Sequence, residues 1–257
     1  MPKSDSVITE TLKTQKSRRN ILKGAVAGAA GVTGLAVAGS SLLSQTSAFA
    51  ASATHDSGCV TPIPQILTIA RTAERLAVTF YTNGLNYADR LGLSYEDKQY
   101  IRAALIEEQI HENFFASAGA GKALASTFSF PHGEETFENL KLFIETQQQL
   151  EGVFDSAFLS AVREFGQQGR PDLSQIAAQI ACIEAEHRAL GRAIGGYVPA
   201  DNWAFTPVLI AKVGDAPALV AKAGYLSPKK GNSYTYHQVS TDDSGVIYRS
   251  PFAVACK

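Results

Sequence analysis

The sequence predicts an all-α protein built around an antiparallel four-helix bundle. Between residues 65 and 197, apolar residues recur at helical spacing in four long runs, and breaks containing glycine or proline separate these runs. Two of the runs contain a Glu followed three residues later by a His. At that spacing a carboxylate and an imidazole project from one face of a helix, about one turn apart. The bundle is therefore expected to carry polar groups on its inward faces.

The composition indicates one globular domain behind a basic leader. The 257 residues are 45% hydrophobic and 18% charged, which is enough to bury one sizeable core. The formal net charge is −1, and residues 1–50 hold six of the 23 basic residues but only two of the 24 acidic ones. The chain without this leader is more acidic, so its charge gives no reason to bind nucleic acid or anionic lipid.

Residues 1–50 are predicted to be a twin-arginine-type signal peptide. Residues 17–23 (SRRNILK) resemble that export signal, residues 24–43 form a weakly apolar run, and residues 48–50 (AFA) suit a cleavage site. We expect export to the periplasm or the cell exterior, with no stable membrane span after cleavage. The alternative is a transmembrane anchor, since the apolar run is 20 residues long. Its Gly, Ala, Ser and Thr content makes the gain on insertion small.

The first two helices follow a flexible lead-in over residues 51–64. The first helix is predicted over residues 65–91, and its apolar stripe includes Glu74. Ser94, with Asp97 three residues later, predicts the start of a second helix that ends near residue 118. The inward stripe of this helix includes Glu108 and His111. Buried carboxylates need partners, so these positions are candidate ligands.

The last two helices repeat this pattern after the longest internal connection, residues 122–135. The third helix is predicted over residues 135–166, with Glu151 on its apolar stripe. The fourth is expected to begin at Asp172 or Ser174 and to continue to residue 195, with Glu184 and His187 facing inward.

The spacing of these residues predicts a site for two metal ions. Glu74 and Glu108 are 34 residues apart and Glu151 and Glu184 are 33 apart, so each of two helical hairpins offers one lone Glu and one Glu-x-x-His. Antiparallel packing would bring four carboxylates and two imidazoles to one level, as in ferritin-like di-iron and di-manganese carboxylate proteins. The predicted metal ligands are Glu74, Glu108, His111, Glu151, Glu184 and His187.

The chemistry of this ligand set favours two iron or two manganese ions. Four clustered carboxylates in an apolar core would repel one another and take up protons, unless two divalent cations offset their charge. Mixed oxygen and nitrogen ligands suit iron or manganese, whereas structural zinc prefers Cys. The pattern does not distinguish iron from manganese. The competing interpretation is a set of salt-bridged surface helices with accidental spacing.

The same stretches resemble the ferritin-like domain of exported bacterial proteins, whose relatives include desiccation-related proteins of plants. The matching segments are residues 72–81 (TAERLAVTFY), 107–111 (EEQIH), 149–154 (QLEGVF) and 183–187 (IEAEH). The resemblance implies a ferritin-like bundle over residues 65–197 with the six ligands named above. It also implies that Glu108 and Glu184 bridge the two metals, as in bacterioferritin and manganese catalase.

Four neighbouring residues have secondary roles in this interpretation. Glu107 and Glu186 point about 100° away from the ligands and are expected to be solvated or hydrogen-bonded. Asp155, one turn after Glu151, is a candidate for orienting a ligand. Tyr81, two turns from the first carboxylate, is expected to be a core tyrosine within reach of the site.

Residues 198–257 are predicted to be a non-helical extension that packs on the bundle. A short helix is expected from Asp215, and residues 233–240 and 245–250 suggest a β-hairpin. The extension either caps the bundle or mediates self-association as a homo-oligomer. In an oxidising compartment Cys59 and Cys256 are expected to pair, while Cys182 is expected to be a small buried hydrophobe.

Two functions of different classes remain open. The first is a redox metalloprotein that oxidises ferrous iron or consumes dioxygen or peroxide. The second is a non-catalytic extracytoplasmic stress or desiccation-related protein, in which the metals mainly stabilise the bundle. An iron-storage cage is disfavoured, because the long connection and the 60-residue extension would have to fit at the subunit contacts.

Overall fold

The computed structural model describes residues 60–242, 245–247 and 251. The predicted signal peptide and the predicted Cys59–Cys256 pair lie outside these residues. Within the described part of the chain, no helix has the length and apolar character needed to cross a membrane.

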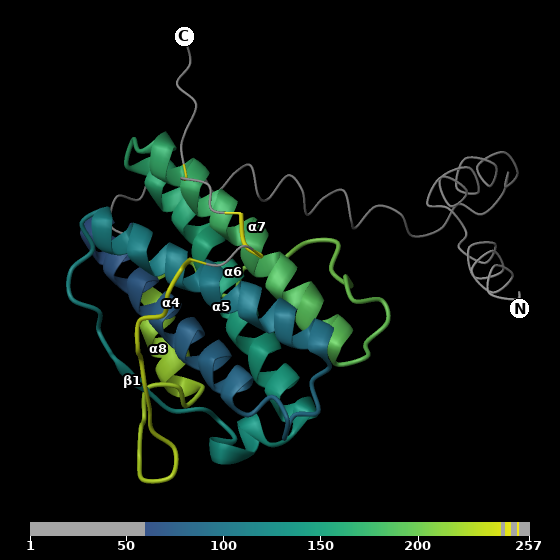
Figure 1. Ribbon diagram of the computed structural model, residues 1–257. Coiled ribbons are helices and arrows are strands. Elements are labelled where there is room, and N and C mark those ends of the chain that lie inside the picture. The colour runs from purple at the N-terminus through teal and green to yellow at the C-terminus, as the bar shows by residue number, and fades with distance from the viewer. Residues whose placement is uncertain (1–59, 243–244, 248–250, 252–257) are drawn as a thin grey trace, which may run out of the picture. The chain divides into compact units, whose positions relative to one another are not determined.

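Four long helices form an α-helical bundle, which confirms the predicted fold class (Figure 1). They are α4 (Ile63–Asn86), α5 (Tyr95–Ser117), α6 (Leu140–Gln167) and α7 (Pro171–Ile194). Helix α4 packs along α5, and α6 packs along α7, so that each short connection joins the two helices of one hairpin. The two hairpins enclose a core in which aliphatic and aromatic side chains surround a few buried acids.

The start of α5 follows the local chemistry that its sequence predicts. The Asp97 amide donates to Ser94 Oγ at 3.1 Å, and the Ser94 amide donates to Asp97 Oδ2 at 3.0 Å. This reciprocal pair satisfies two amides that the first turn of a helix leaves without partners. Gly92, with φ of 67°, forms the preceding turn, where a side chain would be strained.

The predicted cap of α7 was wrong. Its N-cap residue is Arg170, with Pro171 in the first turn, while the predicted caps Asp172 and Ser174 lie inside the helix. Proline suits the first helical position because its missing N–H would have no partner there. The Asp172 carboxylate pairs with the Arg170 guanidinium at 2.7 Å instead. Pro64 likewise lies in the first turn of α4 rather than ahead of it.

The long connection between α5 and α6 closes one end of the bundle with aromatic side chains. It contains β1 (Thr127–Phe128) and a 3-10 helix, η2 (Gly133–Phe137), so α6 begins later than predicted. Phe130 and Phe137 are fully buried and contact Phe80 of α4. The Phe80 ring stacks on Phe143 at 4.6 Å between centroids.

The predicted β-hairpin is not present in the described residues. Strand β2 (Tyr234–Thr235) instead pairs antiparallel with β1, in the register Thr127↔Thr235 and Phe128↔Tyr234. Residues 245–247, the described part of the predicted second strand, adopt no strand structure. The C-terminal extension is therefore attached to the long connection.

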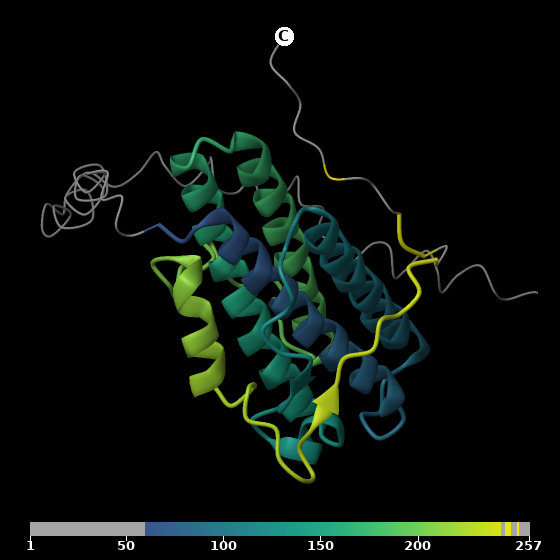
Figure 2. The same ribbon diagram turned by 90° about the vertical axis from the view of Figure 1, so that its left-hand side faces the viewer.

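The extension is also attached to α6. It contains η3 (Val213–Asp215) and the expected short helix, α8 (Ala216–Lys222), which packs on α6; Figure 2 shows α8 beside α4 and α6. The buried carboxylate of Glu164 accepts from the Val213 amide at 2.8 Å and from the Thr61 amide at 2.6 Å. One acid thus joins the segments that precede and follow the bundle.

Candidate metal centre

The structure brings the six residues predicted as ligands together in the bundle interior. They form two overlapping groups, each with ligand atoms within 4.8 Å of one another. The first group is Glu74, Glu108, His111 and Glu184, and the second is Glu108, Glu151, Glu184 and His187. Glu108 and Glu184 belong to both groups, as two bridging carboxylates would.

Each helix contributes through its apolar stripe. Glu74 from α4, Glu108 from α5, Glu151 from α6 and Glu184 from α7 are all at most 1% exposed. The short α4–α5 and α6–α7 connections place these positions at the same height in the bundle. Packing of the apolar stripes thus carries the acids inward with the core residues.

His111 faces the first group of carboxylates. Its Nδ1 lies 3.6 Å from Glu108 Oε2 and 3.9 Å from both Glu74 Oε2 and Glu184 Oε1. Three carboxylates thus surround one ring nitrogen at distances longer than a hydrogen bond. A metal ion between these atoms would have four ligands from three helices.

His187 faces the second group in the same way. Its Nδ1 lies 3.1 Å from Glu108 Oε1, 3.4 Å from Glu184 Oε2 and 3.9 Å from Glu151 Oε1. The side chain of His187 is 2% exposed, whereas that of His111 is 13% exposed. The second group is therefore the more deeply buried of the two.

Most of the ligand atoms of both groups lack hydrogen-bond partners. Among the described residues, both carboxylate oxygens of Glu74, Glu108 and Glu184, one oxygen of Glu151 and the Nδ1 atoms of both histidines are buried and unpaired. Unpaired buried polar atoms are rare because each costs about 1–3 kcal/mol. Such atoms converging on one point fit cations that complete their coordination.

The pKa values of the four buried glutamates reflect how closely these side chains approach one another. Burial, followed by the charge of neighbouring carboxylates, raises the pKa of Glu74, Glu151 and Glu184. Burial acts in the same direction on Glu108, but the close approach of Glu74 and the two histidines outweighs it, so the pKa of Glu108 is lowered. Without cations, this core holds its acids together by retaining protons.

Glu107 fixes the orientation of His187. Its Oε2 lies 2.8 Å from His187 Nε2, the ring nitrogen on the side away from the carboxylate cluster. A proton on Nε2 shared with this carboxylate leaves Nδ1 free to bind a metal. Of the two roles expected for Glu107, hydrogen bonding is the one observed, whereas Glu186 is exposed.

Tyr81 and Gln147 support Glu151. The buried Tyr81 hydroxyl donates to Glu151 Oε1, and Gln147 Nε2 donates to that hydroxyl at 3.2 Å and to the His187 carbonyl at 2.6 Å. Burial, with the nearby carboxylates, raises the pKa of Tyr81. Tyr81 was expected near the site; Gln147 was not, although it lies one helical turn before Glu151.

Two other expectations met different outcomes. Asp155 is buried with one oxygen unpaired, and no hydrogen bond joins it to a ligand among the described residues. Burial and the charge of Glu184 raise its pKa to about 7. The expectation for Cys182 was wrong: this residue is exposed, because it lies on the face of α7 opposite the cluster.

Glu112 is a buried acid that belongs to a different network. Its Oε1 accepts from Arg71 Nε at 2.9 Å and from Arg75 Nε at 2.8 Å. Although burial acts to raise it, these guanidinium groups lower the pKa of Glu112. Because its charge already has partners, Glu112 differs from the unpaired acids of the centre.

A four-helix bundle with two overlapping clusters of buried acids and histidines defines the class of ferritin-like proteins. Residues 64–196 match the model of the ferritin-like domain family, and the chain belongs to that family. No match was found among curated proteins or among solved structures.

Proposed function

We propose that the chain binds two iron or two manganese ions and uses them in redox chemistry, oxidising ferrous iron or consuming dioxygen or peroxide. The ligands would be the six residues of the two groups, with Glu108 and Glu184 bridging. The observation that carries the proposal is the convergence of buried, unpaired oxygen and nitrogen atoms that share these two carboxylates. Mixed carboxylate and imidazole ligands suit both metals.

The residues around the centre have separable tasks in this proposal. Bound metals would supply the exchange of electrons with the oxidant. Glu107 holds the Nε2 proton of His187 and so presents Nδ1 to the centre. The Tyr81 hydroxyl donates a hydrogen bond to Glu151, and this bond limits how far the Glu151 carboxylate can rotate.

Access to the centre is expected on the side of His111. That side chain is 13% exposed, while the ligands of the second group are at most 2% exposed. A small oxidant or a ferrous ion would therefore reach the first group before the second. Packing around His187 leaves only 2% of its side chain exposed.

We also propose that the protein works outside the cytoplasm, on the strength of residues 17–23 (SRRNILK) and the apolar run that follows. Replacing Arg18 and Arg19 by Lys tests this, because twin-arginine export depends on that pair. The substituted protein should remain in the cytoplasm. Unchanged export would contradict the assignment.

A second candidate function is structural. The ligands come from all four long helices, so bound metals would hold both hairpins together and contribute to folding. In this case the metals stabilise an extracytoplasmic stress or desiccation-related protein without turnover.

One experiment separates the two candidates. Metal-loaded protein is assayed for ferrous oxidation and for peroxide and dioxygen loss, beside the Glu108→Ala/Glu184→Ala double variant. The redox proposal predicts turnover by the wild type alone. If the wild type is as inert as the variant while its Tm still rises with metal, the structural function is the correct one.

A further inference from the structure

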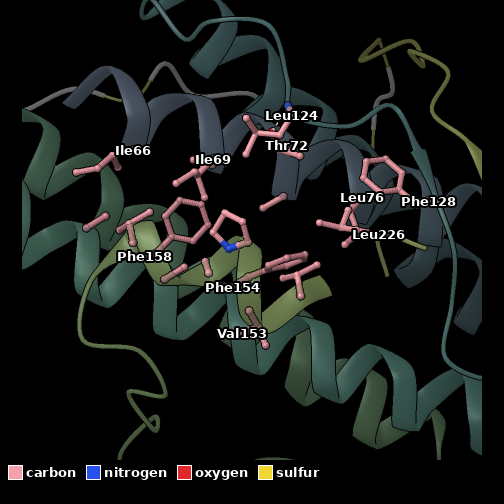
Figure 3. Close-up of a pocket in the computed structure, with 18 residues that line it drawn as sticks. Ile66, Ile69, Thr72, Leu76, Leu124, Phe128, Val153, Phe154, Phe158 and Leu226 are labelled. Atoms are coloured by element: carbon pink, nitrogen blue, oxygen red, sulfur yellow. Dashed lines mark hydrogen bonds between the residues drawn. The ribbon is translucent and has the colours of Figure 1, made fainter. Parts of the chain in front are cut away.

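A second internal feature lies beside the metal centre, between α4, α6 and α8. It is a cavity of about 50 Å³, and Figure 3 shows its walls. Side chains such as Ile69 from α4 and Val153 and Phe154 from α6 line it, and Ala216 and Val220 of α8 cover it. The C-terminal extension thus covers part of a space that the four helices leave unfilled, and the space stays partly open to solvent.

The cavity offers nothing to a polar ligand. Thr72 is the one polar residue in its lining. The Thr72 hydroxyl donates to the Thr68 carbonyl at 2.7 Å and accepts from the Leu124 amide at 2.9 Å, so both of its roles are filled. A buried water needs two to four polar partners, and apolar cavities without them stay dry and bind nonpolar molecules. The fitting occupant is therefore uncharged and nonpolar.

The size of the cavity limits that occupant further. A water-sized probe needs about 10–15 Å³, so 50 Å³ exceeds what a single probe requires. An engineered cavity of about 150 Å³ binds benzene, and this one is roughly a third of that volume. A diatomic gas, xenon or a hydrocarbon of two or three carbons fits, whereas an aromatic ring is too large.

One end of the cavity lies at the level of the metal centre. On α4, Glu74 is flanked by the lining residues Ala73 and Leu76, and on α6, Glu151 precedes the lining residue Val153 by two positions. At a rise of 1.5 Å per residue, these offsets amount to a few ångströms along the bundle. The cavity and the carboxylates therefore occupy neighbouring sectors of the same two helices.

We propose that this cavity is a binding site for a gas-sized nonpolar molecule. Its wall chemistry and volume carry the binding, which is independent of any metal. Dioxygen is the occupant that the neighbouring centre would consume, and this role alone rests on the proposed function. A short hydrocarbon is the alternative occupant, because it is also small and nonpolar.

Xenon is the direct probe of the site. Methyl resonances of residues that line the cavity should shift saturably with xenon pressure in the full-length protein. Ala157→Val places two further methyl groups at the α6 wall and should abolish these shifts. Ala193→Val, the same change on an exposed position of α7, should leave them intact. If Ala157→Val does not fold, Ala216→Val fills the cavity from α8.

The outcomes separate the occupants. Xenon binding lost in the filled variant, with slower dioxygen consumption at low oxygen, supports the site and dioxygen as its occupant. Lost binding with unchanged consumption supports the site and assigns it to another nonpolar molecule. No saturable shift, or the same shift in Ala157→Val, overturns the proposal. If the wild type neither oxidises ferrous iron nor consumes dioxygen or peroxide, the proposed function fails, while the xenon result still decides the site.

Discussion

The two ring nitrogens of His187 face different acids. Nε2 lies against Glu107, and Nδ1 faces the buried carboxylates of Glu108 and Glu184. Burial acts to lower the pKa of His187, but the close approach of Glu107, Glu108 and Glu184 outweighs burial and raises it. A raised pKa means that the ring keeps a proton on Nδ1. A cation between the Nδ1 atom and the carboxylates would replace this proton.

Glu107→Ala tests the support of His187. Without the carboxylate, the ring loses the partner that fixes its tautomer and orientation, so metal affinity should fall about 10- to 100-fold. Glu186→Ala is the matched control, because this acid also adjoins the ligands but is exposed. Titration of each metal-free variant with Mn²⁺ measures its metal affinity. Equal affinities of the two variants would show that Glu107 does not support the centre.

Gly191→Ala tests the position of Gln147. A β-carbon at Gly191 would overlap the Gln147 carboxamide, which must then leave Tyr81 and the His187 carbonyl. Loss of these buried hydrogen bonds should destabilise the protein by about 1–3 kcal/mol in urea unfolding.

Gly152→Ala is the control for that substitution. A β-carbon there meets only Trp203, at an ordinary 3.7 Å. Because alanine favours a helix interior over glycine by about 1 kcal/mol, this variant should be as stable as the wild type or more so. Destabilisation of both variants to the same extent would mean that helix context, and not Gln147, decides the effect.

The positions of the six central residues could be predicted, but the supporting contacts could not. Glu108 and His111 share a helix face by local geometry, and the apolar stripe shows that the face is buried. Glu107 meets His187 across 80 residues of chain, and only the packing of α5 against α7 creates that contact. Gln147 gives no signal because glutamine has no distinctive spacing to a ligand.

At the scale of elements, α6 connects the bundle to the rest of the chain. Glu164 receives the amides of Thr61 and Val213, and Ser156 Oγ accepts from the Leu209 amide at 2.6 Å. These hydrogen bonds satisfy buried backbone amides that have no partner within a helix or strand. The extension that covers the nonpolar cavity depends on them.

Glu164→Ala tests that dependence. Two buried amides would lose a charged acceptor, and the loss should cost about 2–4 kcal/mol in urea unfolding. Amide exchange at Thr61 and Val213 should accelerate as well. Glu164→Gln keeps one acceptor oxygen and should give an intermediate effect. Unchanged exchange at both amides would contradict the role of Glu164.

Helices were easier to predict than the arrangement of the extension. The four long helices follow from local periodicity, and Ser94 marks the start of α5 by a contact that spans three residues. Strand β2 pairs with β1, and Thr127 and Thr235 are 108 positions apart. No local sequence pattern indicates that β1 is the partner of β2. The sequence therefore predicts a hairpin within the extension instead.

At the scale of the whole molecule, the buried centre couples stability to pH. A group whose pKa is raised on folding stabilises the fold below its unfolded pKa and loses that contribution as the pH rises through the folded pKa. Among the buried Asp, Glu and His residues that the structure describes, five have raised pKa values and two, Glu108 and Glu112, have lowered ones. The five are Glu74, Glu151, Asp155, Glu184 and His187.

The metal-free protein should therefore lose stability as the pH rises from the ordinary carboxyl pKa values of 3.8 for Asp and 4.5 for Glu through about 7, where Asp155 titrates. Bound Mn²⁺ replaces the protons, so the loaded protein should not show this loss. Urea midpoints at about pH 5 and pH 8, with and without Mn²⁺, measure the effect. A metal-free protein that becomes more stable toward pH 8 would contradict this assignment of protons.

We propose that four buried carboxylates and two imidazoles hold a pair of metal ions. Anomalous diffraction from crystals grown with Mn²⁺ tests it most directly. The predicted result is two peaks between α4, α5, α6 and α7, one beside each histidine, with Glu108 and Glu184 contacting both. A core that keeps these six side chains in place but shows no peak among them, with metal found only at the surface, would contradict it.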